Sequence, residues 1–176
     1  MTVLSVLFLL LTLLTWRWML LNLRKYPFEL HPAEPRADLR DVVSIIVPMR
    51  NEESHVDSCL NAIRAQSHPH LQVIVVDDAS TDSTPQLLAR WQQQWPELEV
   101  VRLEGCPQGW AGKVHAMHRG QERARGEWLF FTDADVEVAP DAIARSLATA
   151  VERGWPVLSV LGHLVTPSFW ERAIQP

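Results

Sequence analysis

Apolar residues fill most of the first 23 positions of the chain and afterwards recur in shorter runs separated by segments of mixed polarity. The long run, VLSVLFLLLTLLTWRWMLLNL at residues 3–23, has about the length that a helix needs to cross a bilayer at about 1.5 Å per residue. Trp16 and Trp18 flank Arg17 near its carboxyl end, where aromatic and basic side chains suit a membrane interface. A signal peptide is the alternative, but the sequence shows neither a basic region nor a small-residue cleavage site. The pattern predicts one N-terminal transmembrane helix at residues 1–23.

Positive charges follow this apolar segment, whereas no charged side chain precedes it; they are Arg24, Lys25, Arg36 and Arg40. By the positive-inside rule, the rest of the chain is expected on the cytoplasmic side of the membrane, behind a single-pass anchor. Residues 24–41 contain three prolines and no apolar period, so they are predicted to be a Pro-rich linker.

From residue 42 onward, runs of β-branched and aromatic residues alternate with segments that have helical periodicity. The runs predicted to be strands are residues 42–47, 73–76, 100–103, 128–131 and 157–160, of which the first, second and fourth are predicted to be buried. The segments predicted to be helices begin near Ser54, Ser83, Gly112 and Pro140. Because β-α-β crossovers place successive strands parallel, the alternation predicts an α/β domain with a largely parallel, Rossmann-like sheet flanked by helices.

Composition narrows the class of protein further. The net charge of −5 and the pI near 5.8 argue against a nucleic-acid-binding protein. The two cysteines, Cys59 and Cys106, are far apart in the sequence and suggest no disulfide framework, which fits a reducing compartment. Cys59 falls on the apolar face of the first predicted helix of the domain and is expected to be a small core residue.

Two aspartates, Asp133 and Asp135, follow the predicted strand at residues 128–131. In extended backbone, the side chains of residues two apart point to the same side. Two carboxylates at such a short distance need a cation to neutralise them. Mg²⁺ or Mn²⁺ is the expected ion, because these metals take one or two protein carboxylates and complete their shell with water and phosphate oxygens. The alternative is a solvated acidic turn before the helix near Pro140.

Polar residues also follow the first two predicted strands. Ligands of open α/β sheets bind beyond the carboxyl ends of the strands, so these residues are expected to gather at one edge. The first strand delivers Pro48, Arg50 and Glu52, and the second delivers Asp77 and Asp78. A carboxylate there can accept hydrogen bonds from the base or ribose of a nucleotide. The charged residues among these can also be explained without a ligand. The aspartates could form a strand-ending turn, Arg50 could form a surface ion pair, and Glu52 could be favoured by the dipole at a helix start.

The loop GWAGK, residues 109–113, precedes another predicted helix. Glycines allow close approach of the backbone to a ligand, and a helix start offers free N–H groups to an anion beside the charge of Lys113. The spacing is not that of a Walker P-loop, and a plain glycine turn is the alternative. His115 and His118 are three residues apart, but the sequence shows no third metal ligand beside them.

Four segments in this order, VSIIVPMRNEES, VIVVDDASTDST, GWAGKVHA and FTDADV, resemble the N-terminal part of membrane-associated family-2 glycosyltransferases of the GT-A fold. The pair GWAGK and TDADV is most similar to the lipid-glycosylating subgroup, which includes hopanoid-associated, carotenoid-type and ceramide-type enzymes. The terminal PSFWERAIQP is also similar to the hopanoid-associated members. The resemblance implies that residues 42–176 are a nucleotide-sugar-binding domain that is incomplete at its C-terminal end.

The resemblance also implies roles for individual residues. Asp78 and the loop from Pro48 to Arg50 would hold the uridine, Asp133 and Asp135 would lie at the ribose and the metal-bound diphosphate, and Lys113 would lie near the donor phosphates. The residues expected to bind nucleotide-sugar are Pro48, Arg50, Glu52, Asp78, Lys113 and Asp133, and those expected to bind metal are Asp133 and Asp135.

The activity implied is metal-dependent, inverting transfer of a sugar from a nucleotide donor, UDP-linked, to a lipid or polyprenoid acceptor. The family's acidic base and its Q/R-x-x-R-W motif follow the D-x-D strand and find no match here, Glu171 included, so the base is expected beyond residue 176. Three alternatives stay open: a truncated, non-catalytic nucleotide-binding fragment, a polysaccharide synthase, and a nucleotidyltransferase.

Overall fold

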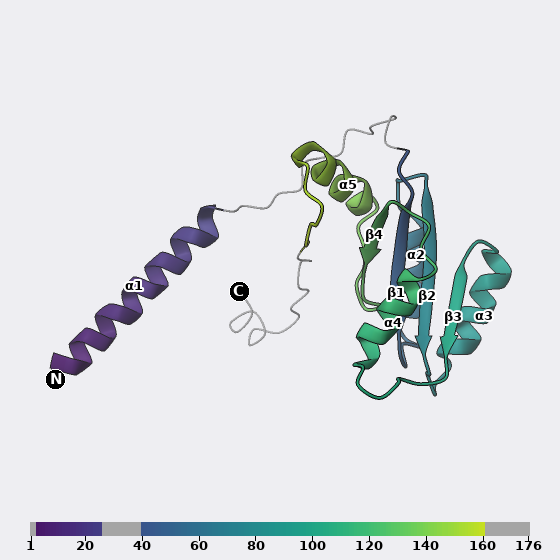
Figure 1. Ribbon diagram of the computed structural model, residues 1–176, viewed down its shortest axis with the longest axis horizontal. Coiled ribbons are helices and arrows are strands. Elements are labelled where there is room, and N and C mark those ends of the chain that lie inside the picture. The colour runs from purple at the N-terminus through teal and green to yellow at the C-terminus, as the bar shows by residue number, and fades with distance from the viewer. Residues whose placement is uncertain (1–2, 26–39, 161–176) are drawn as a thin grey trace. The chain divides into compact units, whose positions relative to one another are not determined.

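The computed structural model describes residues 3–25 and 40–160 (Figure 1). The chain divides into an N-terminal unit, Met1–His31, and a second unit, Pro32–Pro176. Most of the predicted linker and the terminal PSFWERAIQP, with Glu171, lie outside the described residues.

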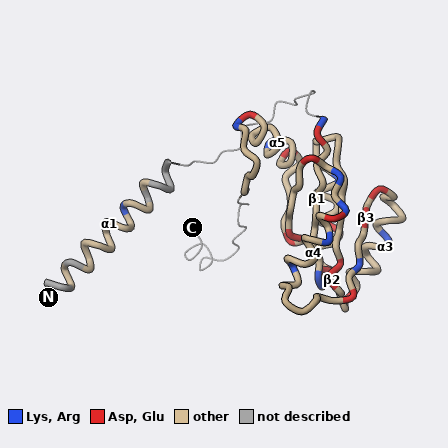
Figure 2. Tube along the Cα trace, in the orientation of Figure 1, with Lys and Arg blue, Asp and Glu red and all other residues tan. Residues whose placement is uncertain are grey.

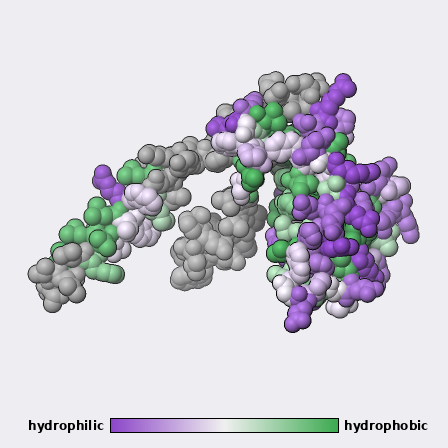
Figure 3. Space-filling model, in the orientation of Figure 1, coloured by the Kyte–Doolittle hydropathy of each residue, from purple (hydrophilic) through white to green (hydrophobic). Residues whose placement is uncertain are grey.

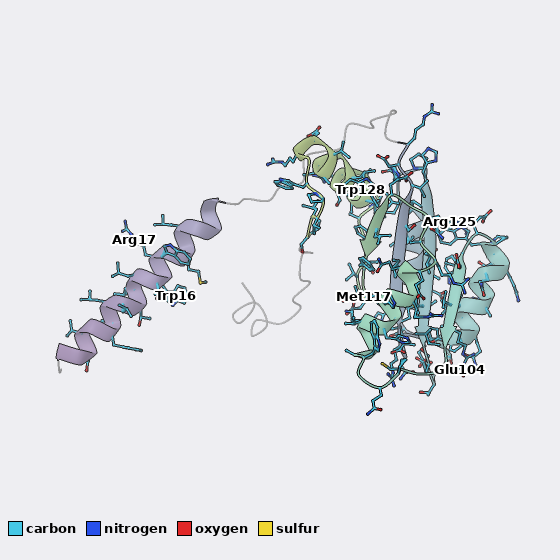
Figure 4. All side chains as sticks on the ribbon, viewed as in Figure 1. Trp16, Arg17, Glu104, Met117, Arg125 and Trp128 are labelled. Carbon is cyan, nitrogen blue, oxygen red and sulfur yellow. The ribbon has the colours of Figure 1, made fainter. Side chains whose placement is uncertain are left out.

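The described part of the N-terminal unit is a single helix, α1 (Val3–Lys25). Large apolar side chains lie exposed along it, from Phe8, which is 75% exposed, to Trp16 and Trp18 (Figure 3). Arg17 interrupts this apolar surface (Figures 2 and 4). Among the residues that the structure describes, however, no helix combines the length and the apolar character that crossing a bilayer requires. The predicted single-pass span at residues 1–23 is therefore not confirmed.

The second unit is built on a four-stranded parallel sheet with the order β3-β2-β1-β4. The strands are β1 (Val43–Met49), β2 (Leu71–Asp78), β3 (Glu99–Leu103) and β4 (Trp128–Phe131). The helices of this unit are α2 (Val56–Arg64), α3 (Thr84–Gln94), α4 (Gly112–Gln121) and α5 (Ala142–Arg153). The prediction of a parallel α/β sheet flanked by helices is confirmed.

The order of the strands creates a switch point between β1 and β4. From β1 the chain moves outward through β2 to β3, and α4 then carries it back across the sheet to β4, on the other side of β1 (Figure 1). The connection from β1 to β2 runs through α2 on one face of the sheet, whereas the connection that arrives at β4 runs through α4 on the opposite face, and a ligand-binding crevice forms at such a switch point. The crevice lies where the polar residues after the strands were expected to gather.

Alternate residues of the strands pack on the two faces of the sheet, as the two-residue period of a strand requires. Ile45 and Val75 belong to a large cluster with apolar residues of α2, α3 and α5. Ile46 and Val76 face the opposite side, where they pack against α4. A Cβ atom on Gly120 of α4 would lie 2.5 Å from Cγ2 of Ile46, so only glycine lets this helix lie so close to the sheet.

Two predicted features of the sheet were wrong. The run at residues 157–160 forms no strand, and Val157 is 80% exposed, so its β-branched side chains have no sheet to pack against. β4 was predicted to be a buried strand, but Leu129 and Phe131 are 38% and 41% exposed. β4 is an outer strand of the described sheet, and α4 lies over β1 and β2, so one face of β4 remains uncovered.

A buried polar network closes the opposite end of the sheet, at the start of β1 and β2. Ser44 Oγ donates to Gln72 Oε1 (2.7 Å), and Gln72 Nε2 donates to the carbonyl oxygen of Arg123 (2.9 Å). The backbone N–H groups of Arg125 and Gly126 donate to Gln72 Oε1 (2.8 Å) and to Ser44 Oγ (2.8 Å) respectively. The network ties the loop before β4 to the central strands; Arg125 is labelled in Figure 4.

Candidate functional site

A pocket of about 420 Å³ opens at the crevice between β1 and β4. Its lining residues come from the ends of β1, β2 and β4 and from the start of α4; they are Pro48, Met49, Arg50, Glu52, Asp78, Gly112, Lys113, Ala116, Asp133, Ala134 and Asp135. All seven residues that the sequence singled out for nucleotide-sugar or metal binding are among them. The structure therefore brings together side chains that lie up to 87 positions apart, counted from Pro48 to Asp135.

Asp78 is the most deeply placed charged residue of the pocket, with only 4% of its surface exposed. Its Oδ2 atom lies 3.5 Å from Nη1 of Arg50, whose side chain is largely exposed. Its Oδ1 atom is buried and has no hydrogen-bond partner within the described part of the chain. A buried carboxylate oxygen without a partner is costly, so this atom is a strong acceptor for a ligand N–H or O–H group.

Gly112 allows Asp78 to take this position. A Cβ atom at residue 112 would lie 2.8 Å from Asp78 Oδ2, which is closer than real Cβ atoms approach an oxygen. The sequence flagged the glycine-rich loop but not Gly112 itself as a site residue. Met49, Ala116 and Ala134 were also missed, because apolar residues carry no chemical signal of a pocket in the sequence.

Lys113 follows in the first turn of α4, and its Nζ atom lies 2.6 Å from Oδ1 of Asp133. The side chains are 59% and 49% exposed, so solvent screens this ion pair and a ligand can reach both partners. The free N–H groups at the start of α4 add partial positive charge to that of Lys113. The pocket thus has a positive wall at α4 and a negative wall after β4.

The acidic pair lies in a turn and not in the extended backbone that was expected. The Val136 N–H donates to the carbonyl oxygen of Asp133 (3.4 Å), which closes the turn just after β4 ends. Ala134, between the aspartates, is 4% exposed and belongs to the core. This buried alanine holds the turn in place while Asp133 and Asp135 both line the pocket.

No group of three or more histidine, cysteine or acidic side chains that could hold a metal occurs among the described residues. Asp133 and Asp135 instead fit a site with only two protein ligands. Mg²⁺ and Mn²⁺ can bind at such a site, because phosphate oxygens and water supply their remaining ligands. His115 and His118 instead contact Trp110, whose ring stacks on that of His118 at a centroid distance of 5.1 Å. These histidines form an aromatic cluster outside the pocket.

Cys59 lies behind the pocket wall in the core, as predicted. Burial, and then the negative charges of Asp135 and Glu52, raise the pKa of its thiol to about 12. The thiol therefore stays protonated at neutral pH and is no nucleophile.

A parallel four-stranded sheet flanked by helices, with a pocket at its switch point, defines an α/β domain of the GT-A type. Residues 44–175 match the family described as Glycosyl transferase family 2. The chain belongs to this family.

Three known proteins show how far the likeness extends. The 4,4'-diaponeurosporenoate glycosyltransferase of Staphylococcus aureus (strain bovine RF122 / ET3-1) is 32% identical over 133 residues, which are 73% of this chain and 34% of that protein. The structure of S. aureus TarS 1-349 in complex with UDP-GlcNAc is 29% identical, with a TM-score of 0.56 over 64% of this chain and 32% of that one. The mannosyltransferase PcManGT from Pyrobaculum calidifontis, in complex with GDP-Man and Mn2+, is 30% identical, with a TM-score of 0.59 over 78% of this chain and 39% of that one. The chain spans less than half the length of each of these relatives.

Proposed function

We propose that this chain is the donor-binding part of a glycosyltransferase that moves a sugar from a nucleotide, UDP, to the hydroxyl group of a lipid or polyprenoid acceptor with inversion at the anomeric carbon. The observation that carries the proposal is the pocket at the switch point, which has a buried, unpaired acceptor at one end and paired opposite charges at the other. Family membership supports the class of reaction.

The base and ribose of the donor would lie at the Asp78 end of the pocket. Asp78 Oδ1 is a buried acceptor, which suits the N3–H of uracil or a ribose hydroxyl. Arg50, whose Nη1 atom lies 3.5 Å from Oδ2 of the same carboxylate, would contact the base from the side. Pro48 and Glu52 would complete this wall of the pocket.

The diphosphate would lie between α4 and the acidic turn. Lys113 and the free N–H groups of the first turn of α4 would bind its oxygens directly. Asp133 and Asp135 would hold a Mg²⁺ or Mn²⁺ ion, and the structure of the mannosyltransferase PcManGT contains Mn2+ together with GDP-Man. When bound, such an ion supplies Lewis-acid stabilisation of the leaving diphosphate.

In the reaction, the acceptor hydroxyl oxygen would form a bond to the anomeric carbon as the bond from that carbon to the diphosphate oxygen breaks. Negative charge then grows on the diphosphate, where Lys113 and the helix start are preorganised to stabilise it. The acceptor proton passes to a base. We propose that this base lies beyond residue 176, since the carboxylates that line the described pocket are already assigned to the nucleotide and the metal.

The exposed apolar surface of α1 supports a membrane-bound acceptor. The side chains of Phe8, Leu13 and Trp16 are each more than half exposed, and such a surface needs an apolar partner. We propose that α1 attaches the protein to the cytoplasmic face of a membrane and that residues 24–41 tether the domain, residues 42–176, to it. The basic residues that follow the apolar run would favour an anionic leaflet.

Calorimetric titration of the full chain with UDP, with and without Mn²⁺, tests the donor site. We expect Mn²⁺ to tighten UDP binding at least tenfold, and Asp135→Ala to abolish this gain, since about 1.4 kcal/mol corresponds to a factor of ten. Glu137→Ala is the matched control, because Glu137 is exposed in the same loop but does not line the pocket. Tighter binding of UTP or GDP than of UDP would contradict the donor assignment, and indifference to metal in the wild type would contradict the role of the acidic pair.

Flotation with anionic vesicles tests the membrane proposal separately. The double variant Leu9→Glu with Leu13→Glu, in exposed positions of α1, is expected to stay with the soluble fraction while the wild type floats. Val157→Glu, at a still more exposed apolar position in the other unit, is the control and should float like the wild type. Equal flotation of the α1 variant and the wild type would show that α1 is not the attachment.

A further inference from the structure

Hydrogen bonds join two neighbouring loops at the Asp78 end of the pocket. The first, residues 50–55, links β1 to α2 and carries Arg50 and Glu52 into the pocket. The second, residues 79–83, links β2 to α3 and begins directly after Asp78. The positions of Arg50 and Asp78 relative to one another therefore depend on how these loops are held.

Asn51 makes three of the hydrogen bonds in this contact, although it does not itself line the pocket. Its backbone N–H donates to Ser80 Oγ (3.0 Å), and Ser80 is almost completely buried. Its side-chain Oδ1 atom accepts from the backbone N–H of Thr81 (2.8 Å) and from the Thr81 hydroxyl (3.3 Å). One residue next to Arg50 thus binds both residues that follow Ala79.

Further hydrogen bonds continue this contact along the loops. The Glu52 N–H donates to Thr84 Oγ1 (2.9 Å), and Thr84 is fully buried. The Glu53 N–H donates to Asp82 Oδ2 (3.1 Å), while Glu53 Oε2 accepts from the Ser83 N–H (3.0 Å). Every residue of the second loop except Ala79 is therefore hydrogen-bonded to the first loop.

The backbone at the contact is strained on both sides. Asn51 has φ of +56° and Ala79 has φ of +54°, a left-handed conformation that costs of order 1 kcal/mol for residues other than glycine. Asparagine adopts it more readily than most residues, but alanine has no such preference. Strain of this kind persists only where surrounding contacts impose it, and here the strained residues adjoin Arg50 and Asp78.

We propose that Asn51 is a positioning residue of the donor site: it joins the two loops so that Arg50 and Asp78 are held ready for the nucleotide base and ribose. This inference rests on the proposed function, because it needs Asp78 and Arg50 to contact the donor. Asn51 would act on the nucleotide end of the pocket only, since Asp133 and Asp135 are held by the turn after β4.

Nucleotide and metal titrations of Asn51 variants test the inference. Asn51→Gly keeps the left-handed backbone accessible and removes only the side-chain acceptor, so UDP in the presence of Mn²⁺ should bind about three- to tenfold more weakly, as the loss of one or two hydrogen bonds predicts. Asn51→Asp keeps an oxygen at the same place and should bind UDP within about twofold of the wild type. The affinity for Mn²⁺ alone should be the same in all three proteins.

Two further variants serve as a negative control and as an independent test of the same contact. Asn61→Ala removes an asparagine whose side chain bonds only the backbone of α2, and it should leave UDP binding unchanged. Ser80→Ala removes the other side of the contact and should reproduce the loss, which keeps the test decisive if Asn51→Gly does not fold. Equal UDP affinity of Asn51→Gly and the wild type, or an equal loss of Mn²⁺ affinity, would overturn the inference alone. A wild-type protein that binds no UDP would overturn the proposed function and this inference with it.

Discussion

The Nζ atom of Lys113 lies 2.6 Å from the Oδ1 atom of Asp133, so an ion pair joins the first turn of α4 to the acidic turn after β4. The pair lies in the wall of the pocket, where a diphosphate and a divalent cation are proposed to bind. Both partners are about half exposed, so the pair contributes only about 0–1 kcal/mol to stability. A ligand can therefore replace it at little cost.

Lys113→Met is expected to change the affinities for Mn²⁺ and for UDP in opposite directions. Without the ammonium group, Asp133 is free for a cation, and Mn²⁺ alone should bind about two- to fivefold more tightly, as a gain below 1 kcal/mol predicts. UDP should bind about tenfold more weakly, because a charge-assisted hydrogen bond to phosphate is lost. Calorimetry with each ligand measures both effects.

Arg119→Ala is the control for this prediction, since Arg119 lies on the same helix and pairs with Glu122 away from the pocket. It should change neither affinity. If Lys113→Met weakened Mn²⁺ binding, the lysine would be supporting the acidic pair and not competing with the metal.

Gly112→Ala is expected to impair the site without unfolding the domain. The new Cβ atom would meet Asp78 Oδ2 at 2.8 Å and push the carboxylate out of its position, so UDP should bind at least tenfold more weakly, the equivalent of about 1.4 kcal/mol. Alanine is a better helix residue than glycine, so the thermal midpoint should fall by little or not at all.

Gly120→Ala provides the opposite pattern on the same helix. Its Cβ atom would lie 2.5 Å from Ile46 in the core, and overpacking there should cost about 1–3 kcal/mol of unfolding free energy in a urea titration. UDP binding by the folded fraction should be retained. Similar behaviour of the two alanine variants would show that Gly112 serves packing and not the site.

Ser44→Ala is expected to destabilise the domain through the polar network at the start of β1. The hydroxyl accepts from the Gly126 N–H and donates to Gln72, so its removal leaves buried groups unpaired at a cost of about 1–3 kcal/mol. Urea unfolding followed by circular dichroism measures the loss. Ser58→Ala, at an exposed serine whose hydroxyl donates to the carbonyl oxygen of His55 just before α2, should stay within about 0.5 kcal/mol of the wild type.

Asp57 is expected to make stability depend on pH in the acid range. Hydrogen bonds from Arg90 and then from Trp91 lower the pKa of its carboxyl group, against a small opposing effect of burial. A lowered pKa means that the stabilisation is complete well above the usual value of 3.8 and is lost as the pH falls through the folded-state pKa.

Asp57→Asn should therefore be less stable than the wild type at pH 7 by about 0.5–1 kcal/mol, a modest value because the pair is half exposed. The difference should shrink below about pH 4 and disappear at lower pH. Urea titrations at several pH values measure it. A difference that stayed constant with pH would show that Asp57 contributes by packing and not by charge.

The local pattern of the sequence was sufficient to predict most of the elements. The β-branched runs at residues 42–47 and 73–76 are strands, and the stripe of apolar residues in α2 is buried, because strand and helix periods are properties of neighbouring residues. The run at residues 157–160 had the same local signal and forms no strand. A strand also needs a partner, and that depends on the rest of the fold.

The pocket residues could be named from the sequence because polar residues after parallel strands meet at one edge, whatever the order of the strands. Only the tertiary structure decided which of them are neighbours. The return of the chain to β4 beside β1 sets Lys113 against Asp133, and the packing of α4 through Gly120 brings Gly112 against Asp78. Such contacts join residues far apart in the chain, and no local period encodes them: they follow from strand order and from the path of each loop.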